Sequence, residues 1–143
     1  MIFRIAQYLC VLAALLLPAA SQAAGRTSAL QAGAVQAGAP QLVMAERSDC
    51  PWCLAWHREV GPGYPHSDEG RLAPLRRVDL NKAWPADLPK AAGVIYTPTF
   101  LLVACGREIG RITGYPGADF FYPKLDQLLE RLGSARKPDG SCA

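Results

Sequence analysis

The sequence has a low net charge, few potential metal ligands and no long apolar run, and each of these argues against one class of protein. Its formal net charge is only +3, and acidic and basic residues are interspersed along the chain, so nucleic acid is not an expected partner. Two histidines and two methionines leave little material for a cluster of metal ligands, and we expect no metal or other cofactor. The N-terminal apolar run, residues 5–17, is shorter than the roughly 20 residues that cross a bilayer.

The N-terminus instead has the pattern of an export signal. Arg4 supplies a positive charge before the apolar run, and Ser21-Gln22-Ala23 fits a small-x-small cleavage site. Cleavage after Ala23 would leave 143 − 23 = 120 residues, the size of one domain. We expect residues 1–23 to be a cleavable signal peptide, with an uncleaved membrane anchor as the less favoured alternative.

The remaining chain divides into a lead-in, a domain and a tail. Residues 24–40 are mostly Ala, Gly, Gln and Ser and predict a flexible lead-in, because they offer little apolar surface to bury. The folded domain is expected over residues 41–133 and a tail over residues 134–143. Apolar patterns and turn residues predict the order strand, helix, strand, helix, strand, strand, helix.

The expected elements can be placed by residue number. A buried strand at 41–46 should lead into a helix at 50–60, with Asp49 as its N-cap. Residues 64–70 are rich in turn formers. The later elements are strands at 75–80, 99–103 and 108–113, a short helix within 83–92 broken by two prolines, and an amphipathic helix at 119–132 that ends at Gly133.

The run Cys50-Pro51-Trp52-Cys53 begins the first predicted helix. Unpaired N–H groups and a partial positive charge at a helix N-terminus favour a thiolate, so Cys50 is the expected nucleophile. Cys53, three residues further, would attack the resulting mixed disulfide and release the reduced substrate. Trp52 is expected beside the sulfurs, where its flat apolar ring would support a substrate peptide. We therefore predict a redox-active dithiol.

Two other interpretations of this pair stay open. A purely structural disulfide between Cys50 and Cys53 would close a very small loop, which stabilises little. Alternatively, Cys50, Cys53 and His57 offer three soft or borderline ligands, as in a copper-binding thioredoxin-like module.

The element order, with Cys-x-x-Cys at the first helix and Thr97-Pro98 before the third strand, resembles the thioredoxin fold over residues 41–132. Residues 56–60 (WHREV) and 106–117 (GREIGRITGYPG) are similar to periplasmic thioredoxin-like proteins of bacterial sulfur-oxidation (Sox) systems. The resemblance implies an α/β domain with a central mixed β-sheet flanked by helices, and a periplasmic location.

The resemblance also implies a function. Pro98 should be cis, leaving the backbone at Thr97 free to pair with an extended substrate. The expected activity is reduction of disulfides or mixed thiol adducts on periplasmic partner proteins, including a cysteine-bearing sulfur carrier, with electrons from a membrane thiol transporter. Stabilisation of the Cys50 thiolate favours an oxidant, whereas threonine before the proline resembles isomerases and reductases, so disulfide isomerase or oxidase stays as an alternative.

The proton acceptor for the resolving thiol is less clear from the sequence. Thioredoxins place a buried acid six residues before the first cysteine, and this chain has Met44 there. Glu46 is the substitute candidate for proton transfer. His57, one helical turn after Cys53, is a second candidate, although a histidine in such a helix is more often a partly exposed side chain.

Two cysteines lie outside the motif. Cys105 falls in a predicted hairpin turn and Cys142 near the C-terminus, and a disulfide between them would pin the tail to the sheet. The alternatives are a second exchange site that relays electrons to Cys50, or a free thiol that forms dimers. Sequence alone does not supply the distance between the two cysteines.

Overall fold

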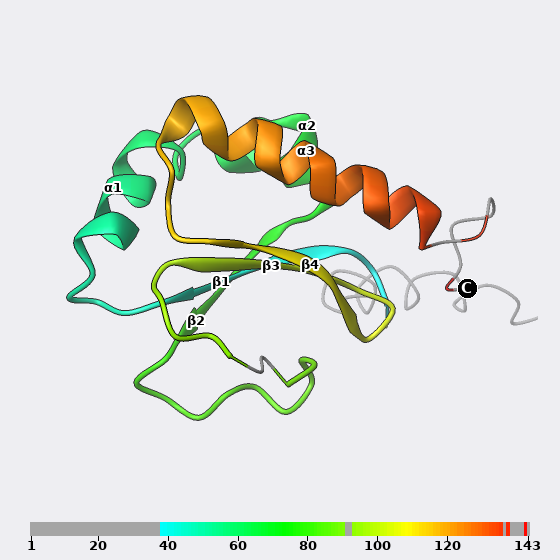
Figure 1. Cartoon of the computed structure of the whole chain (residues 1–143), viewed down its shortest axis with the longest axis horizontal. Coiled ribbons are helices and arrows are strands. Elements are labelled where there is room, and N and C mark those ends of the chain that lie inside the picture. Colours follow the sequence, from blue (N-terminus) through cyan, green and yellow to red (C-terminus); the bar gives the residue numbers. More distant parts are fainter. Residues whose placement is uncertain (1–37, 91–92, 136, 138–141, 143) are drawn as a thin grey trace, which may run out of the picture. The chain divides into compact units, whose positions relative to one another are not determined.

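The structure is a computed structural model that describes residues 38–90, 93–135, 137 and 142 (Figure 1). The predicted signal peptide, residues 1–23, and the predicted lead-in as far as residue 37 lie outside the described residues, as does most of the predicted tail.

Within the described part of the chain, no helix combines the length and the apolar character needed to cross a membrane.

Four strands form one mixed sheet in the order β2-β1-β3-β4. Strand β1 (Gln41–Glu46) pairs in parallel with β2 (Leu75–Asp79) and antiparallel with β3 (Thr99–Ala104). Strand β3 in turn pairs antiparallel with β4 (Arg107–Thr113). All four predicted strands are present, and the mixed sheet with its helices confirms the predicted α/β class.

The two central strands are buried on both faces. Because side chains alternate along a strand, Leu42 and Met44 of β1 face one core, whereas Val43 and Ala45 face another on the opposite side of the sheet. Strand β3 alternates in the same way. The continuous apolar runs that predicted these strands therefore reflect central positions with packing on both sides.

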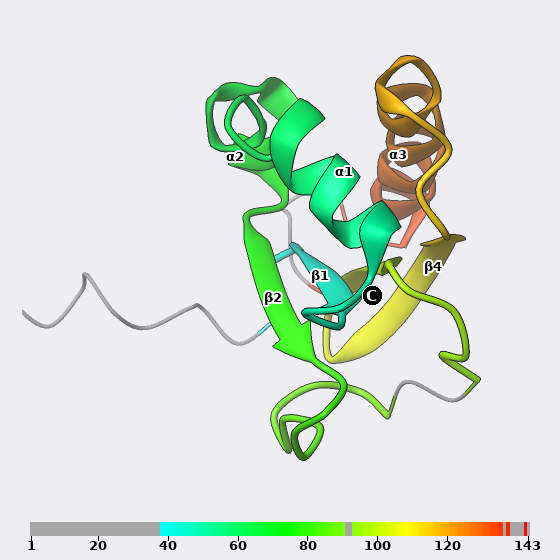
Figure 2. The same cartoon turned by 90° about the vertical axis from the view of Figure 1, so that its left-hand side faces the viewer.

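The helices of the described residues cover one face of the sheet (Figures 1 and 2). They are α1 (Pro51–Glu59), a 3-10 turn (Tyr64–His66), α2 (Asp68–Leu72) and α3 (Ala118–Ser134). Aromatic rings fill the space beneath them: the ring of Trp56 lies 5.4 Å from that of Phe100 and 5.7 Å from that of Phe121, centroid to centroid. These tilted and edge-on contacts fix α1 and α3 against the sheet.

The second predicted helix is wrong in its position. Residues 83–90 are irregular, because Pro85 and Pro89 cannot donate the backbone hydrogen bonds of a helix. A short helix, α2, lies instead before β2, in the stretch that the turn formers marked as a loop. Its signal was present: Ser67 caps it by accepting a hydrogen bond from the N–H of Gly70 at 3.0 Å, with two acidic residues in the first turn.

The last helix extends further than predicted. Helix α3 continues through Gly133 to Ser134, and the N–H of Ala135 donates to the carbonyls of Arg131 and Leu132. The expected stop at Gly133 is therefore wrong, since a glycine weakens a helix without necessarily ending it.

An irregular segment between β2 and β3 covers the second face of the sheet. Leu80, Trp84, Leu88 and Val94 pack on the apolar side chains of that face. A bidentate ion pair between Arg76 of β2 and Asp87 ties the segment to the sheet edge. The segment continues directly into Thr97 and Pro98, so its packing sets where those two residues lie.

A disulfide joins Cys105 to Cys142 in the structure. Cys105 occupies the β3–β4 turn with a positive φ of 54°, and its N–H donates to the carbonyl of Gly38 at 3.0 Å. The bond thus ties the C-terminal tail to the end of the sheet where β1 begins.

This arrangement predicts a stability effect. The disulfide spans 37 residues of sequence, and loop-closure entropy for such a loop corresponds to about 4 kcal/mol in the unfolded chain. We expect Cys142→Ser to lower the free energy of unfolding of the oxidised protein by about 2–4 kcal/mol, measured in guanidinium chloride. After full reduction the variant and the parent should unfold alike, and peptide mapping without reductant should recover the linked pair. Equal stability of the two oxidised proteins would contradict the prediction.

Candidate functional site

Cys50 itself caps helix α1. Its backbone is extended (φ −86°, ψ 112°), and its sulfur accepts a hydrogen bond from the N–H of Cys53 at 3.2 Å. The prediction of Asp49 as the N-cap is therefore wrong by one residue. Pro51 follows at the first helical position, where its missing N–H removes no helical hydrogen bond. The capping places the sulfur against the positive end of the helix.

The predicted Thr97-Pro98 element lies opposite this sulfur. The Sγ atom of Cys50 donates to the carbonyl oxygen of Thr97 at 3.2 Å, although the two residues are 47 positions apart. The peptide bond between Thr97 and Pro98 is cis. The carbonyl of Pro98 accepts from the N–H of Gly114 at 2.8 Å, and the hydroxyl of Thr99 donates to the carbonyl of Tyr96, so the segment is held from both sides.

The environment of Cys50 favours its thiolate. Burial is the largest single influence and opposes the charged form, but hydrogen bonds outweigh it. These involve the side chains of Cys53 and Thr97 and the backbone N–H groups of Cys53 and Trp52. Together they lower the pKa of the Cys50 thiol below its ordinary value.

Cys53 has the opposite character. It lies one turn deeper, with 1% of its surface exposed. Burial, followed by its hydrogen bond with Cys50 and the charge of that neighbour, raises the pKa of the Cys53 thiol to about 12. The two sulfurs therefore differ in readiness to ionise: the Cys50 thiol, with 7% of its surface exposed, ionises more readily than an ordinary thiol, and the Cys53 thiol less readily.

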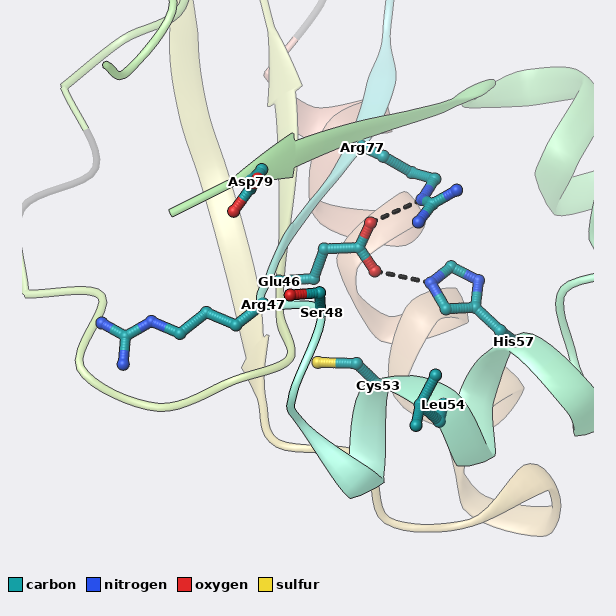
Figure 3. Close-up of a pocket in the computed structure, with 8 residues that line it drawn as sticks. All are labelled: Glu46, Arg47, Ser48, Cys53, Leu54, His57, Arg77 and Asp79. Atoms are coloured by element: carbon teal, nitrogen blue, oxygen red, sulfur yellow. Dashed lines mark hydrogen bonds and ion pairs between the residues drawn. The ribbon is translucent and has the colours of Figure 1, made fainter. Parts of the chain in front are cut away.

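A small cavity opens beside Cys53, with a volume of about 130 Å³. Figure 3 shows the Glu46 carboxylate reaching into it between His57 and Arg77, with the Cys53 sulfur on another wall. The Oε2 atom of Glu46 lies 2.5 Å from Nε2 of His57, and its Oε1 atom lies 2.5 Å from Nε of Arg77. The cavity is lined by Glu46, Arg47, Ser48, Cys53, Leu54, His57, Arg77 and Asp79.

Large apolar side chains stand exposed on both segments that meet at Cys50. Trp52 is 62% exposed, as the sequence predicted, and Ile95 and Tyr96 are 76% and 67% exposed just before Thr97. Exposed apolar groups of this size often mark a surface that another protein covers. Sequence reasoning missed Ile95 and Tyr96, although two large apolar residues in a loop next to Thr-Pro were a usable signal.

The other predicted residues divide between the site and the far end of the sheet. Met44 is completely buried under the helices, in the position where thioredoxins carry an acid. Cys105 follows Ala104, the last residue of β3, which lies about 17 Å along the strand from Thr99. Its disulfide with Cys142 is thus remote from Cys50, and the two pairs do not meet within one molecule of this structure.

Potential metal ligands do not gather at the dithiol. Among residues 38–90, 93–135, 137 and 142, no group of three or more His, Cys, Asp or Glu side chains is arranged to hold a metal ion. The Nε2 atom of His57 is engaged with Glu46.

Comparison with solved structures defines the class. The periplasmic thioredoxin SoxS of Paracoccus pantotrophus, in its reduced form, is 43% identical to this chain with a TM-score of 0.62, over 64% of this chain and 97% of that protein. The fold and the paired cysteines are those of a thiol-disulfide oxidoreductase. The chain belongs to the periplasmic thioredoxins of the SoxS type, which confirms the predicted resemblance.

Other comparisons add less. A thioredoxin of Malassezia sympodialis, Mala s 13, is 16% identical over 63% of this chain and 75% of that protein, with a TM-score of 0.48, and the assignment does not depend on it. No protein-family model and no curated protein matches the chain.

The contrast between the two thiols gives a direct prediction. Because the pKa of Cys50 is lowered and that of Cys53 is raised, iodoacetamide should label Cys50 alone between pH 6 and 8, at least about tenfold faster than Cys53. The rate should rise with a midpoint below ~8.5, the value of an unperturbed thiol. Mass mapping of the labelled peptides identifies the site. Preferential labelling of Cys53, or a midpoint above that value, would contradict the prediction.

Proposed function

We propose that this protein is a periplasmic disulfide reductase that acts on other proteins, with Cys50 as its nucleophile and Cys53 as its resolving thiol. The observation that carries the proposal is the placement of the Cys50 sulfur, which caps α1 and faces the Thr97 carbonyl. A thiolate held there is activated by the helix and lies beside a backbone segment able to pair with a substrate.

The proposed reaction proceeds in two exchanges. A substrate disulfide rests against Trp52, Tyr96 and the Thr97-Pro98 segment. The Cys50 thiolate attacks one of its sulfurs, the substrate S–S bond breaks, and the leaving sulfur departs as a thiolate that takes up a proton. Cys53 then loses its proton and attacks Cys50. The mixed disulfide breaks, the substrate leaves fully reduced, and the protein retains a Cys50–Cys53 disulfide.

The reductase direction is supported by the way the Cys50 thiolate is stabilised. The influences that lower its pKa are hydrogen bonds, with no cationic side chain among them. Strong oxidants owe their high reduction potential to a stabilised reduced form, and a cationic side chain beside Cys50 would add to such stabilisation. The raised pKa of Cys53 also keeps the second thiol uncharged. Both features are consistent with a dithiol that gives electrons away.

The proposed setting comes from the resemblance to SoxS, a periplasmic thioredoxin, and from the signal-peptide pattern of residues 1–23. In that setting the substrate would be a cysteine-bearing sulfur-carrier protein, linked by a disulfide or blocked by a thiol adduct. Because each turnover oxidises the Cys50–Cys53 pair, a membrane thiol transporter would return the electrons.

The roles of the two cysteines predict different mutant behaviours. Cys50→Ser should abolish insulin reduction, with a loss of at least about 10³-fold, because the remaining thiol of the pair, Cys53, is buried and has a raised pKa. Cys53→Ser should keep the first exchange and accumulate a mixed disulfide with the partner, which mass spectrometry can identify from periplasmic extract. Cys105→Ser is the matched control and should keep full activity. Residual activity of Cys50→Ser would refute the assigned nucleophile.

The direction of exchange is tested by the reduction potential of the dithiol. We expect a value near that of thioredoxins, about −270 mV, and well below the roughly −120 mV of a strong periplasmic oxidant. Equilibration with dithiothreitol buffers, followed by trapping of free thiols, gives this number. A potential above about −180 mV would favour the isomerase or oxidase alternative.

A further inference from the structure

A buried carboxylate stands beside the resolving thiol. The Glu46 side chain is 10% exposed and makes short contacts with two side chains, Nε2 of His57 and Nε of Arg77, both at 2.5 Å. Arg77 is largely exposed and supplies a positive charge at the edge of the cavity. A carboxylate removed from water to this extent is tolerated because both of its oxygens are paired.

Strand β1 and helix α1 place Glu46 close to Cys53 and His57. Glu46 is the last residue of β1 and shares a face with Met44, since side chains two apart on a strand point the same way. That face lies under α1. On α1, Cys53 and His57 are four residues apart and therefore project from the same side of the helix. Figure 3 shows the sulfur, the carboxylate and the imidazole around a common space.

The space between them can hold water. Its volume of about 130 Å³ is enough for several water molecules, and its lining includes carboxylate, imidazole, guanidinium and hydroxyl groups. Water in such a cavity has hydrogen-bond partners on several sides. It can therefore carry a proton between a thiol and a carboxylate that do not touch directly.

We propose that Glu46 is the proton acceptor for Cys53, reached through water in this cavity, and that His57 and Arg77 are positioning residues that hold its carboxylate there. The inference rests on the proposed function, in which Cys53 resolves the mixed disulfide. In that step the Cys53 proton passes to Glu46, the Cys53 sulfur bonds to the Cys50 sulfur, and the bond from Cys50 to the substrate breaks. The substrate sulfur leaves with the electron pair, and the dithiol is oxidised.

The chemistry of Cys53 explains why an acceptor is needed. Burial, the largest influence that raises the pKa of the Cys53 thiol, persists when Cys50 is bonded to the substrate, so the thiol stays mostly protonated at neutral pH, and a thiol attacks far more slowly than a thiolate. Met44, buried under α1, has no group that can take the proton. A positioned general base typically contributes 10²–10⁴-fold.

Other charged groups also face the cavity and provide controls. Arg77 and Asp79 come from β2, His57 from α1, and Arg47 from the segment after β1. Asp79 is the alternative carboxylate, but its Oδ1 accepts from the N–H of Asn81 at 2.9 Å and it is more exposed than Glu46. Asp79→Asn thus removes a carboxylate from the same cavity without touching the proposed acceptor.

The experiment separates the two exchanges in the full chain. Protein carrying Cys10→Ser, with Cys50 and Cys53 reduced and the Cys105–Cys142 disulfide intact, is mixed with dithiobis(nitrobenzoate). The reagent releases one coloured thiolate when Cys50 attacks and a second when Cys53 resolves the adduct. We expect Glu46→Gln to keep the rate of the first release within about twofold of the parent's and to slow the second release at least ~10-fold at pH 7. The defect should shrink as pH rises, because hydroxide then removes the Cys53 proton. Glu46→Asp should recover part of the rate, and Asp79→Asn should match the parent.

Each outcome bears on one claim. A second release as fast in Glu46→Gln as in the parent, or slowed equally at every pH, would overturn the role of Glu46. If Glu46→Gln also slows the first release, its site is damaged and Glu46→Asp becomes the deciding variant. A second release in Glu46→Asp with the same pH dependence as in the parent supports the role of Glu46. A second release whose rate no longer depends on pH overturns it. If Cys50→Ser still gives the first release, the failure lies in the proposed function.

Discussion

The antiparallel pairing of β1 with β3 is the contact on which the rest of the structure depends. The pairing runs from Gln41 opposite Val103 to Ala45 opposite Thr99, and the core side chains on both strands are almost fully buried. At one end of this pair, β1 leads into the cysteine-capped helix and β3 begins at the cis proline. Because the two strands are in register, the Cys50 sulfur and the Thr97 carbonyl meet at 3.2 Å. The Cys105 disulfide closes the opposite end.

Much of the fold was predictable because its signals are local. The central strands appear as apolar runs and helix α3 as a periodic pattern. The start of helix α1 is marked by the Cys-x-x-Cys that follows the first apolar run. The helix before β2 was missed because it has only five residues, too few to show periodicity, and its usable signals were the Ser67 cap and the two acidic residues that follow it. The loop that covers the second face has no pattern of its own, since tertiary packing rather than local propensity fixes it.

The site was predictable in its sulfurs but not in its surroundings. Glu46 and His57 could be selected as candidates from their spacing relative to Cys53, yet nothing in the sequence joined them to Arg77, which comes from a different strand. That connection depends on the parallel register of β1 and β2, which places Glu46 opposite Asp79 and Met44 opposite Arg77. Glu46 lies one strand repeat, about 7 Å, further along β1 than Met44, at the end of the strand.

The irregular segment between β2 and β3, which leads into Thr97, also covers the second face of the sheet. Leu88 is buried there against Val43, Leu101 and their neighbours, and exposing one such side chain costs about 1.5–3 kcal/mol. A partner that pulled the segment out of place would have to expose several of these residues to water at once. The segment beside Cys50 is therefore held in place by burial, and in the proposed function a substrate disulfide would have to conform to it rather than displace it.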